Sequence, residues 1–293
     1  MKKSRKTLLI VMLVALVVVS AAFGVYIWRE RYSKTNGRPA INCPTDSLSV
    51  GVEALSDYSL LLSDVTATDP EDGDVTKSLV VESVSQFVED RHCIVTYAAF
   101  DSANHVTKVS RHVFLTDYVP PRFVITAPLE FSYSSTFNPL KVVKAFDCVD
   151  GDISDRILMN LANPEDNFKS VGTHRVEFKV TNSLGDVALL ETEIVVYNRT
   201  YTEIRMTPVI NLSEYVVYAD GSGSIDPMSY VKGITLGGVS YTVDEYTEGE
   251  LKVDDVGINY SVPGVYKILF TCSNKDDYIG SAVLLVVVTG VND

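Results

Sequence analysis

A short acidic phrase occurs twice in the chain, and its carboxylates are the residues best suited to chemistry. The first copy is Ala67-Thr68-Asp69-Pro70-Glu71-Asp72-Gly73-Asp74, and the second is Ala145-Phe146-Asp147-Cys148-Val149-Asp150-Gly151-Asp152, with Asp155 just beyond it. Closely spaced carboxylates suit a hard cation such as Ca²⁺, which takes 6–8 oxygen ligands. Asp-Gly pairs also build tight turns, because Asp bonds the backbone and Gly accepts a positive φ. Both interpretations, calcium at Asp69–Asp74 and Asp147–Asp155 or plain turns, stay open on the sequence.

The known calcium-loop pattern fits the first copy poorly. A helix–loop–helix site needs Gly at its sixth position, and counting from Asp69 that position is Asp74. We therefore assign no metal-ligating residue from the sequence.

Histidines and nucleophiles give no catalytic pattern. The sequence has no His-Glu-x-x-His, no Gly-x-Ser-x-Gly and no phosphate loop. No histidine stands at metal-ligand spacing from another in the set His92, His105, His112 and His174. The sequence therefore predicts that the protein is not an enzyme and has no catalytic or cofactor-binding residue and no cofactor.

Cysteines occupy places in the chain that do not correspond between repeats, and we expect no disulfide. Cys43 begins an early expected strand and Cys93 a late one, which puts them about 20 Å apart in a sandwich. A disulfide needs Cα atoms within about 7 Å. Cys272 is expected to be a buried, small apolar residue, and Cys148 lies inside the second acidic phrase.

An apolar run near the N-terminus has the length of a membrane span. Residues 7–28 contain no charged side chain, and as a helix they would measure about 33 Å. Tyr26 and Trp28 stand at its end, where aromatic side chains favour the membrane interface. Residues 1–6 are expected to form a short cytoplasmic tail, and residues 29–38 a juxtamembrane linker.

Basic residues flank both ends of this run, so they do not decide which end of the helix faces the cytoplasm. We infer the orientation instead from which flanking segment is long enough to fold into a domain. The tail is too short to make a domain, and we expect a single-pass protein with a cytoplasmic N-terminus and an extracellular body. A cleavable signal peptide is the alternative, because residues 19–21 (Val-Ser-Ala) fit a small-residue cleavage site. Either reading exports the body.

Charge divides sharply along the chain. Residues 1–38 carry a net charge of +7, and since the whole chain carries −13, residues 39–293 carry −20. A body this acidic repels phosphate backbones, which argues against nucleic acid as a partner.

Short apolar stretches separated by turn residues follow the linker, which is typical of antiparallel sandwiches. Residues 174–181 alternate strictly, with Val176, Phe178 and Val180 apolar between polar neighbours, so one face meets a core. Val95, Tyr97 and Ala99 take the matching places in the first repeat. The set Tyr266, Ile268, Phe270 and Cys272 does so in the third.

Three domains follow from this repeat: 39–117, 118–199 and a diverged 200–293. Pro120-Pro121 marks the first boundary, because tandem prolines continue neither helix nor sheet. The third repeat lacks the acidic phrase, and we expect the loop Ser222–Asp226 in its place. The predicted fold class is all-β, with tandem immunoglobulin-like β-sandwiches after one N-terminal transmembrane helix.

The pattern of acidic phrase, turn, alternating strand and Asp/Asn/Gly turn resembles the immunoglobulin-like repeats of bacterial surface proteins. Similar modules accompany some insecticidal crystal toxins, and the hyaline-repeat family looks related. The resemblance covers about 160 residues well and the last 90 loosely. It implies β-sandwiches that space or display things on a cell surface, and it carries over no catalytic residue.

We therefore expect a membrane-anchored bacterial cell-surface protein with an adhesion, scaffold or display role. Its partners would be the membrane, through the helix, and an unidentified protein or cell-wall polysaccharide. The alternative is a carbohydrate-binding module, which needs an exposed row of aromatic side chains. In the third domain that row could come from Tyr215, Tyr218, Tyr230 and Tyr241.

Overall fold

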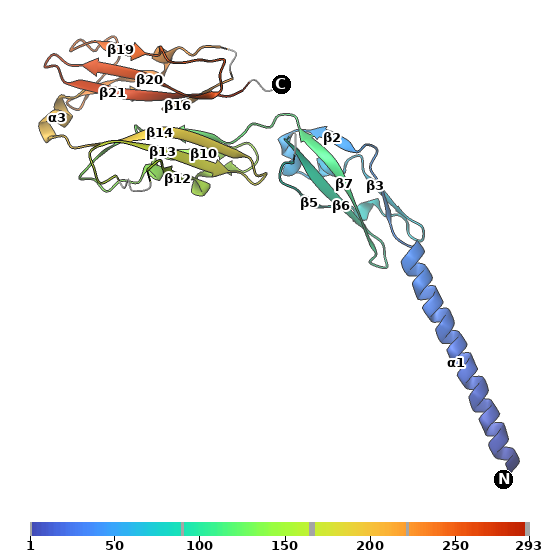
Figure 1. The fold of residues 1–293 in the computed structure, drawn as a ribbon. Helices are drawn as coiled ribbons and strands as arrows, with labels where there is room; N and C mark the ends of the chain where they lie inside the picture. Colours follow the sequence, from blue (N-terminus) through green and yellow to red (C-terminus); the bar gives the residue numbers. More distant parts are fainter. Residues whose placement is uncertain (1, 89–90, 164–167, 221–222, 291–293) are drawn as a thin grey trace. The chain divides into compact units, whose positions relative to one another are not determined.

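The computed structural model describes residues 2–88, 91–163, 168–220 and 223–290, with side chains omitted for 2–10 and 30–36. The chain divides into two compact units, Met1–Tyr118 and Val119–Asp293, and each is described by itself. The first unit holds one long helix and one β-sandwich, and the second holds two more sandwiches (Figure 1). The all-β class expected from the strand pattern is confirmed.

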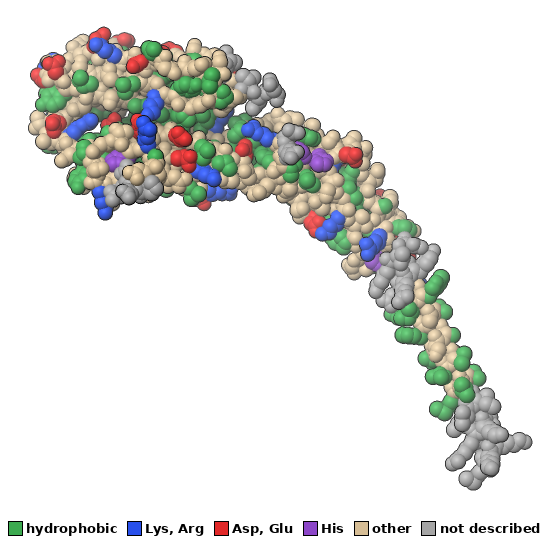
Figure 2. Space-filling view, in the orientation of Figure 1, with side chains coloured by type: hydrophobic (Ala, Val, Ile, Leu, Met, Phe, Trp, Pro, Cys, Tyr) green, Lys and Arg blue, Asp and Glu red, His purple; other side chains and the backbone are tan. Residues whose placement is uncertain are grey.

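Helix α1 (Lys2–Asn36) contains the apolar run. Val11–Arg29 has a mean hydropathy of 2.4 and none of it is buried inside the protein. Figure 2 shows hydrophobic side chains along the described part of this helix. A helix that is apolar all round requires an apolar surrounding, and this one is long enough to cross a membrane; a signal sequence has the same character. The stretch 29–38, expected as a linker, instead continues the helix as far as Asn36.

The first sandwich packs two sheets. One sheet has the order β1-β3-β4 and the other β2-β7-β6-β5. Their strands are β1 (Ala40–Asn42), β2 (Ser47–Val50), β3 (Thr66–Asp69), β4 (Gly73–Asp74), β5 (Val80–Val84), β6 (His92–Phe100) and β7 (Val106–Leu115). Short helical turns join them: η1 (Val52–Leu55), α2 (Ser59–Leu62) and η2 (Thr76–Ser78).

The second sandwich repeats this order. Its sheets are β11-β10-β8 and β12-β13-β14-β9. The strands are β8 (Arg122–Ile125), β9 (Glu130–Ser132), β10 (Val143–Asp147), β11 (Gly151–Asp152), β12 (Leu158–Leu161), β13 (Gly172–Thr181) and β14 (Val187–Tyr197). The helical turns are η4 (Pro139–Lys141) and η5 (Ser154–Arg156).

The third sandwich has sheets β15-β17-β18 and β16-β21-β20-β19. The strands are β15 (Val209–Leu212), β16 (Val216–Ala219), β17 (Val231–Leu236), β18 (Val239–Tyr241), β19 (Leu251–Asp254), β20 (Gly264–Ser273) and β21 (Ile279–Val288). Helix α3 (Tyr201–Met206) precedes them, and η6 (Pro227–Tyr230) lies between β16 and β17.

All three sandwiches share one topology. In each, a short early strand pairs in parallel with the last strand: β2 with β7, β9 with β14, and β16 with β21. In each sandwich, the last two strands form a long antiparallel hairpin. The fourth residue of each hairpin turn has a positive φ, and these residues are Asn104, Gly185 and Asp277. The strand–turn–strand unit read from the sequence is therefore present three times.

The expected inward residues fill the cores. Val95, Tyr97 and Ala99 are fully buried in the first sandwich, and Phe178 is fully buried in the second. In the third, Cys272 is fully buried as expected. The apolar cluster of the second unit runs through both of its sandwiches. Burial of apolar surface is the main favourable term in folding, so these cores hold the loops in place.

The loop proposed to replace the acidic phrase in the third sandwich was misplaced. In the first two sandwiches, the acidic phrase runs on from the end of the middle strand of the three-stranded sheet, β3 or β10. The middle strand of the matching sheet in the third sandwich is β17. β17 turns directly into β18 through Gly237 and Gly238, whose φ values are +60° and +91°. The loop 222–226, of which residue 222 lies outside the described residues, instead leads into η6, where Asp226 caps Pro227–Tyr230 as Asn138 caps η4.

Candidate functional site

The acidic phrase of the first sandwich forms a tight turn between β3 and β4. Asp69 Oδ1 accepts hydrogen bonds from the backbone N–H of Glu71 (2.8 Å) and Asp72 (2.9 Å). Gly73 has a φ of +75°, which favours glycine. Asp74 Oδ1 then accepts from the Thr76 N–H at 2.9 Å and starts η2.

The second copy repeats this geometry. Asp147 Oδ1 accepts from the N–H groups of Val149 and Asp150, both at 2.9 Å. Gly151 has a φ of +72°, and Asp152 Oδ1 accepts from the Ser154 N–H at 3.0 Å. Two copies of one phrase thus fold into the same turn.

The middle aspartate of each phrase reaches across to the hairpin turn before the last strand. Asp72 accepts from Ser102 N–H at 2.6 Å and from Ser102 Oγ at 2.9 Å. Asp150 makes the same pair of contacts with Ser183, both at 2.7 Å. We call each of these two contacts a loop latch, because it fastens two loops that are 30 and 33 residues apart in sequence.

The latch in the second sandwich carries an additional cation. Arg156 Nη1 lies 2.5 Å from Asp150 Oδ2. Burial raises the pKa of Asp150, but the hydrogen bonds from Ser183 and Arg156 outweigh it, and the pKa lies below its ordinary value. The ionised carboxylate is therefore the form that the latch uses.

These contacts favour the turn interpretation of the acidic phrases over the calcium interpretation. Three aspartates of each phrase accept hydrogen bonds from backbone N–H or hydroxyl donors, although Asp69 Oδ2 has no partner among the described residues. Among the described residues, no group of three or more His, Cys, Asp and Glu side chains is arranged to hold a metal ion. The chemistry of the phrases is to fix loop shape.

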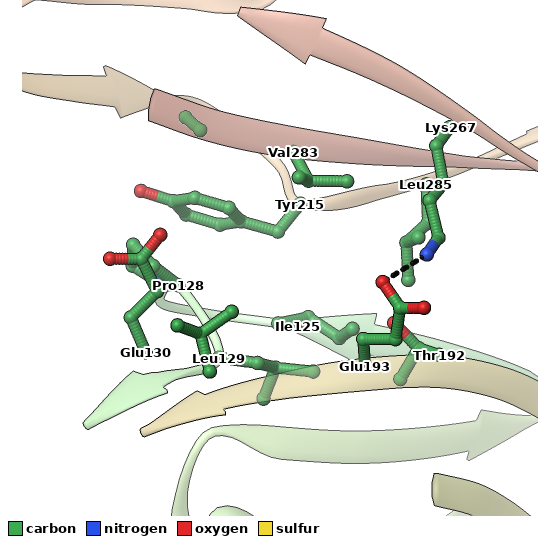
Figure 3. A pocket seen from close by; sticks show the side chains of 12 residues that line it. Ile125, Pro128, Leu129, Glu130, Thr192, Glu193, Tyr215, Lys267, Val283 and Leu285 are labelled. Atoms are coloured by element: carbon green, nitrogen blue, oxygen red, sulfur yellow. Dashed lines mark hydrogen bonds and ion pairs between the residues drawn. The ribbon is translucent and has the colours of Figure 1, made fainter. Parts of the chain in front are cut away.

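A small cavity lies elsewhere, between the second and third sandwiches within the second unit (Figure 3). We call it the interdomain slot. It measures about 80 Å³. Its apolar lining includes Ile125 of β8, Leu129 just before β9, and Val283 and Leu285 of β21.

Glu130 and Tyr215 stand at one end of the slot, where Figure 3 shows the carboxylate on the same side as the phenol oxygen. Burial raises the pKa of Glu130, and the charge of Arg199 lowers it in part. Burial also raises the pKa of Tyr215, and the charge of Glu130 raises it further. Burial is thus the largest cause of both shifts, and the Glu130 charge adds to the shift of Tyr215.

An ion pair closes the other end. Lys267 Nζ of β20 lies 2.6 Å from Glu193 Oε2 of β14, and so joins the two sandwiches (Figure 3). The slot therefore has a carboxylate at one end, an apolar middle and a neutralised pair at the other. That arrangement can hold a short group that is apolar along its length and positive at one tip.

Comparison with known proteins identifies no family. No family model matches the chain. An uncharacterized 81.3 kDa protein of Acholeplasma phage L2 is 28% identical over 147 residues, which are 49% of this chain and 18% of that protein. The chain thus spans under a fifth of the length of this relative.

Two solved structures show weak similarity to parts of the chain. The EC1-3 fragment of Drosophila N-cadherin is 12% identical, with 85% of this chain and 99% of that chain covered and a TM-score of 0.31. The CBM51-2 structure with GlcNAc and INT domains of Clostridium perfringens ZmpB is 17% identical, with 52% and 26% covered and a TM-score of 0.22. At these values neither carries an inference about what this chain binds.

The tyrosines considered for carbohydrate binding do not form an exposed row. Tyr215 is buried against the slot. Tyr218 accepts a hydrogen bond from the Phe123 N–H at 2.6 Å, with Arg122 4.9 Å over its ring, so it lies at the seam between the second and third sandwiches. Tyr230 and Tyr241 are half-buried. The third sandwich uses these rings for packing.

Two histidines meet in space although their sequence spacing hides it. His92 Nε2 lies 2.8 Å from His112 Nδ1 across the β6–β7 hairpin. No histidine stands at metal-ligand spacing from another in the sequence, and this contact arises because a long hairpin brings positions 20 apart together. Within the described residues, no disulfide joins any of Cys43, Cys93, Cys148 and Cys272, and burial raises the pKa of Cys93 to about 11.

Sequence reasoning missed Glu130, Glu193 and Lys267 altogether. A lone glutamate in a short strand and one charge among many on long strands give no motif. The one signal for the slot was the position of Glu130. It is a charged residue that directly follows Leu129 and is partly buried in a strand of three residues.

Proposed function

We propose that the protein is a membrane-anchored, non-catalytic cell-surface protein in which helix α1 holds outward-facing β-sandwiches in a scaffold, display or adhesion role. One observation carries the proposal. Helix α1 carries the exposed apolar run Val11–Arg29 and continues through polar residues to Asn36. Only residues 37–39 separate its end from β1 at Ala40, so in the proposed arrangement a short polar helical stretch joins the membrane span to the first sandwich.

The surface chemistry supports this reading over enzymatic or nucleic-acid roles. The body is strongly acidic, which disfavours binding to phosphate backbones. One carboxylate of each acidic phrase, Asp72 or Asp150, is held in a loop latch. Carbohydrate binding through the third sandwich is disfavoured because its tyrosines are turned into the packing.

The test is the location of the body in intact cells. Cells expressing the full chain are treated with a membrane-impermeant protease, and membranes are separately extracted with alkaline carbonate. We expect the body to be digested from outside and the chain to stay with the membrane at its full 32.2 kDa. A matched variant, Leu16→Lys with Val17→Lys, places two charges in the span and should be lost from the membrane fraction.

Two outcomes would contradict the proposal. A body protected in intact cells but digested after lysis would place it inside. A mature chain shortened by the length of the helix would make α1 a removed signal sequence and leave the body without this anchor.

A further inference from the structure

The interdomain slot has the size of a side chain rather than of a drug-like ligand. Small-molecule pockets usually measure roughly 300–1,000 Å³, and this one measures about 80 Å³. One water-sized group needs roughly 10–15 Å³ on this scale, so the slot has room for about five to eight such groups. A ligand of about five non-hydrogen atoms therefore fits by volume.

Glu130 supplies the main electrostatic feature. Within the described residues its carboxylate has no hydrogen bond and no ion pair, although it is half-buried and lines the slot. A desolvated carboxylate without donors is costly, and a cationic donor is the partner that compensates it best. The positive charge of Arg199 lowers the pKa of Glu130, and the Arg199 guanidinium carbon lies 4.6 Å over the ring of Tyr197.

The rest of the slot fixes the orientation of a ligand. Its lining between the two ends is mostly apolar, with Ile125, Leu129 and Val283 facing the slot. At the far end Lys267 already neutralises Glu193, so a positive group gains nothing there and is repelled by the ammonium. A cation must therefore turn its charge toward Glu130 and its aliphatic stem toward Leu285 and Lys267.

We propose that the interdomain slot binds a protonated primary amine at the end of an unbranched aliphatic chain of about four carbons, with the ammonium on the Glu130 carboxylate and the stem between Leu129 and Val283. This chemistry has two sources, a lysine side chain of a protein partner or a free aliphatic amine. The inference does not depend on the surface location proposed above, because it rests on the second unit alone.

The experiment titrates the purified full-length chain in detergent with n-butylammonium, observed by ligand NMR. We expect saturable binding, with n-butanol and butyrate, which match in size but lack the charge or reverse it, binding at least about tenfold more weakly. Glu130→Gln should weaken n-butylammonium binding by about tenfold or more. The control Glu191→Gln changes an exposed glutamate of β14 outside the slot and should leave it unchanged.

A second variant keeps the test decisive should Glu130→Gln disturb folding. Arg199→Gln removes the positive charge that competes for Glu130, so it should tighten binding by several-fold. A merely structural role of Arg199 predicts no change or a loss. Circular dichroism of each variant reports whether the sandwiches are intact.

The two sources are separated by Nα-acetyl-lysine methylamide and its Nε-acetylated form. Tighter binding of the lysine amide than of n-butylammonium assigns a protein partner, and equal or weaker binding assigns a free amine; both support the ammonium site. Equal binding of n-butanol and n-butylammonium, or unchanged binding in Glu130→Gln, would overturn the proposal.

Discussion

Asn182 Nδ2 donates a hydrogen bond to Asp147 Oδ2 at 3.0 Å, and both side chains are buried. Asp101 is the residue of the first sandwich at the same place in its hairpin: its N–H donates to His105 O, as the Asn182 N–H donates to Asp186 O. Asp101 carries no amide, and Asp69 Oδ2, the counterpart of Asp147 Oδ2, is a buried oxygen without a partner among the described residues. One residue difference thus leaves the first copy of the turn incomplete.

Asp101→Asn should therefore stabilise the first sandwich. The new amide can donate to Asp69, and its oxygen can keep the bond from the His105 N–H that now measures 2.7 Å. We expect a gain of about 1 kcal/mol, the usual net value of one hydrogen bond. Hydrogen exchange of β3 and β6 amides in the full chain measures it. A loss of protection would mean that the Asp101 contact with the His105 ring matters more than the missing donor.

Asn182→Asp should have the opposite effect in the second sandwich. It removes the donor to Asp147 and places a second carboxylate beside a buried one. The expected cost is about 1–3 kcal/mol. Denaturant unfolding followed by exchange in β10 and β13 gives the value. Asn160→Asp, at an exposed position on β12, serves as the control and should cost far less.

Asp150→Ala should open the latch of the second sandwich. The N–H and hydroxyl of Ser183 and the guanidinium of Arg156 would all lose their acceptor. We expect a loss of about 1–3 kcal/mol and faster exchange of the Ser183 amide. Glu71→Ala, an exposed acid in the other phrase, is the comparison variant. Equal effects of the two changes would rule out the latch.

Acid should weaken the same latch. The pKa of Asp150 is lowered in the folded protein, so the folded state binds its proton less readily than the unfolded state does. The stabilisation is complete above the unfolded pKa of about 3.9 and is lost as the pH falls through the lower folded value. Unfolding measured between about pH 5 and pH 2 should show a smaller acid-induced loss in Asp150→Asn than in the wild type.

Tyr218→Phe should weaken the seam between the second and third sandwiches. The change removes the oxygen that accepts from the Phe123 N–H at 2.6 Å and leaves that donor without its partner. The expected cost is about 1–3 kcal/mol, seen by calorimetry as earlier unfolding of the second unit. Tyr133→Phe, half exposed, should change the midpoint little. If the seam depended on ring packing alone, Tyr218→Phe and Tyr133→Phe would have similar unfolding midpoints.

The sequence alone determined the repeated parts of this protein. The period-two alternation of Val176, Phe178 and Val180 predicted an amphipathic strand, and burial confirms it, because side chains on a strand alternate between faces. The Asp-Gly pairs predicted turns, because local hydrogen bonds and glycine's positive φ need only nearby residues. The apolar run predicted a long helix for the same local reason.

Tertiary structure decided what depends on partners far away in sequence. The pairings of Asp72 with Ser102, His92 with His112, and Lys267 with Glu193 join residues 20 to 74 positions apart. Even where one partner stands out, as Asp72 does in its acidic phrase, nothing in the sequence names the other partner, so a sequence pattern could assign neither the latches nor the slot. The proposal that Tyr215 and Tyr218 are exposed was wrong for the same reason. The sequence around an aromatic residue does not tell whether it lies on the surface or between two packed sandwiches, and only the tertiary structure does.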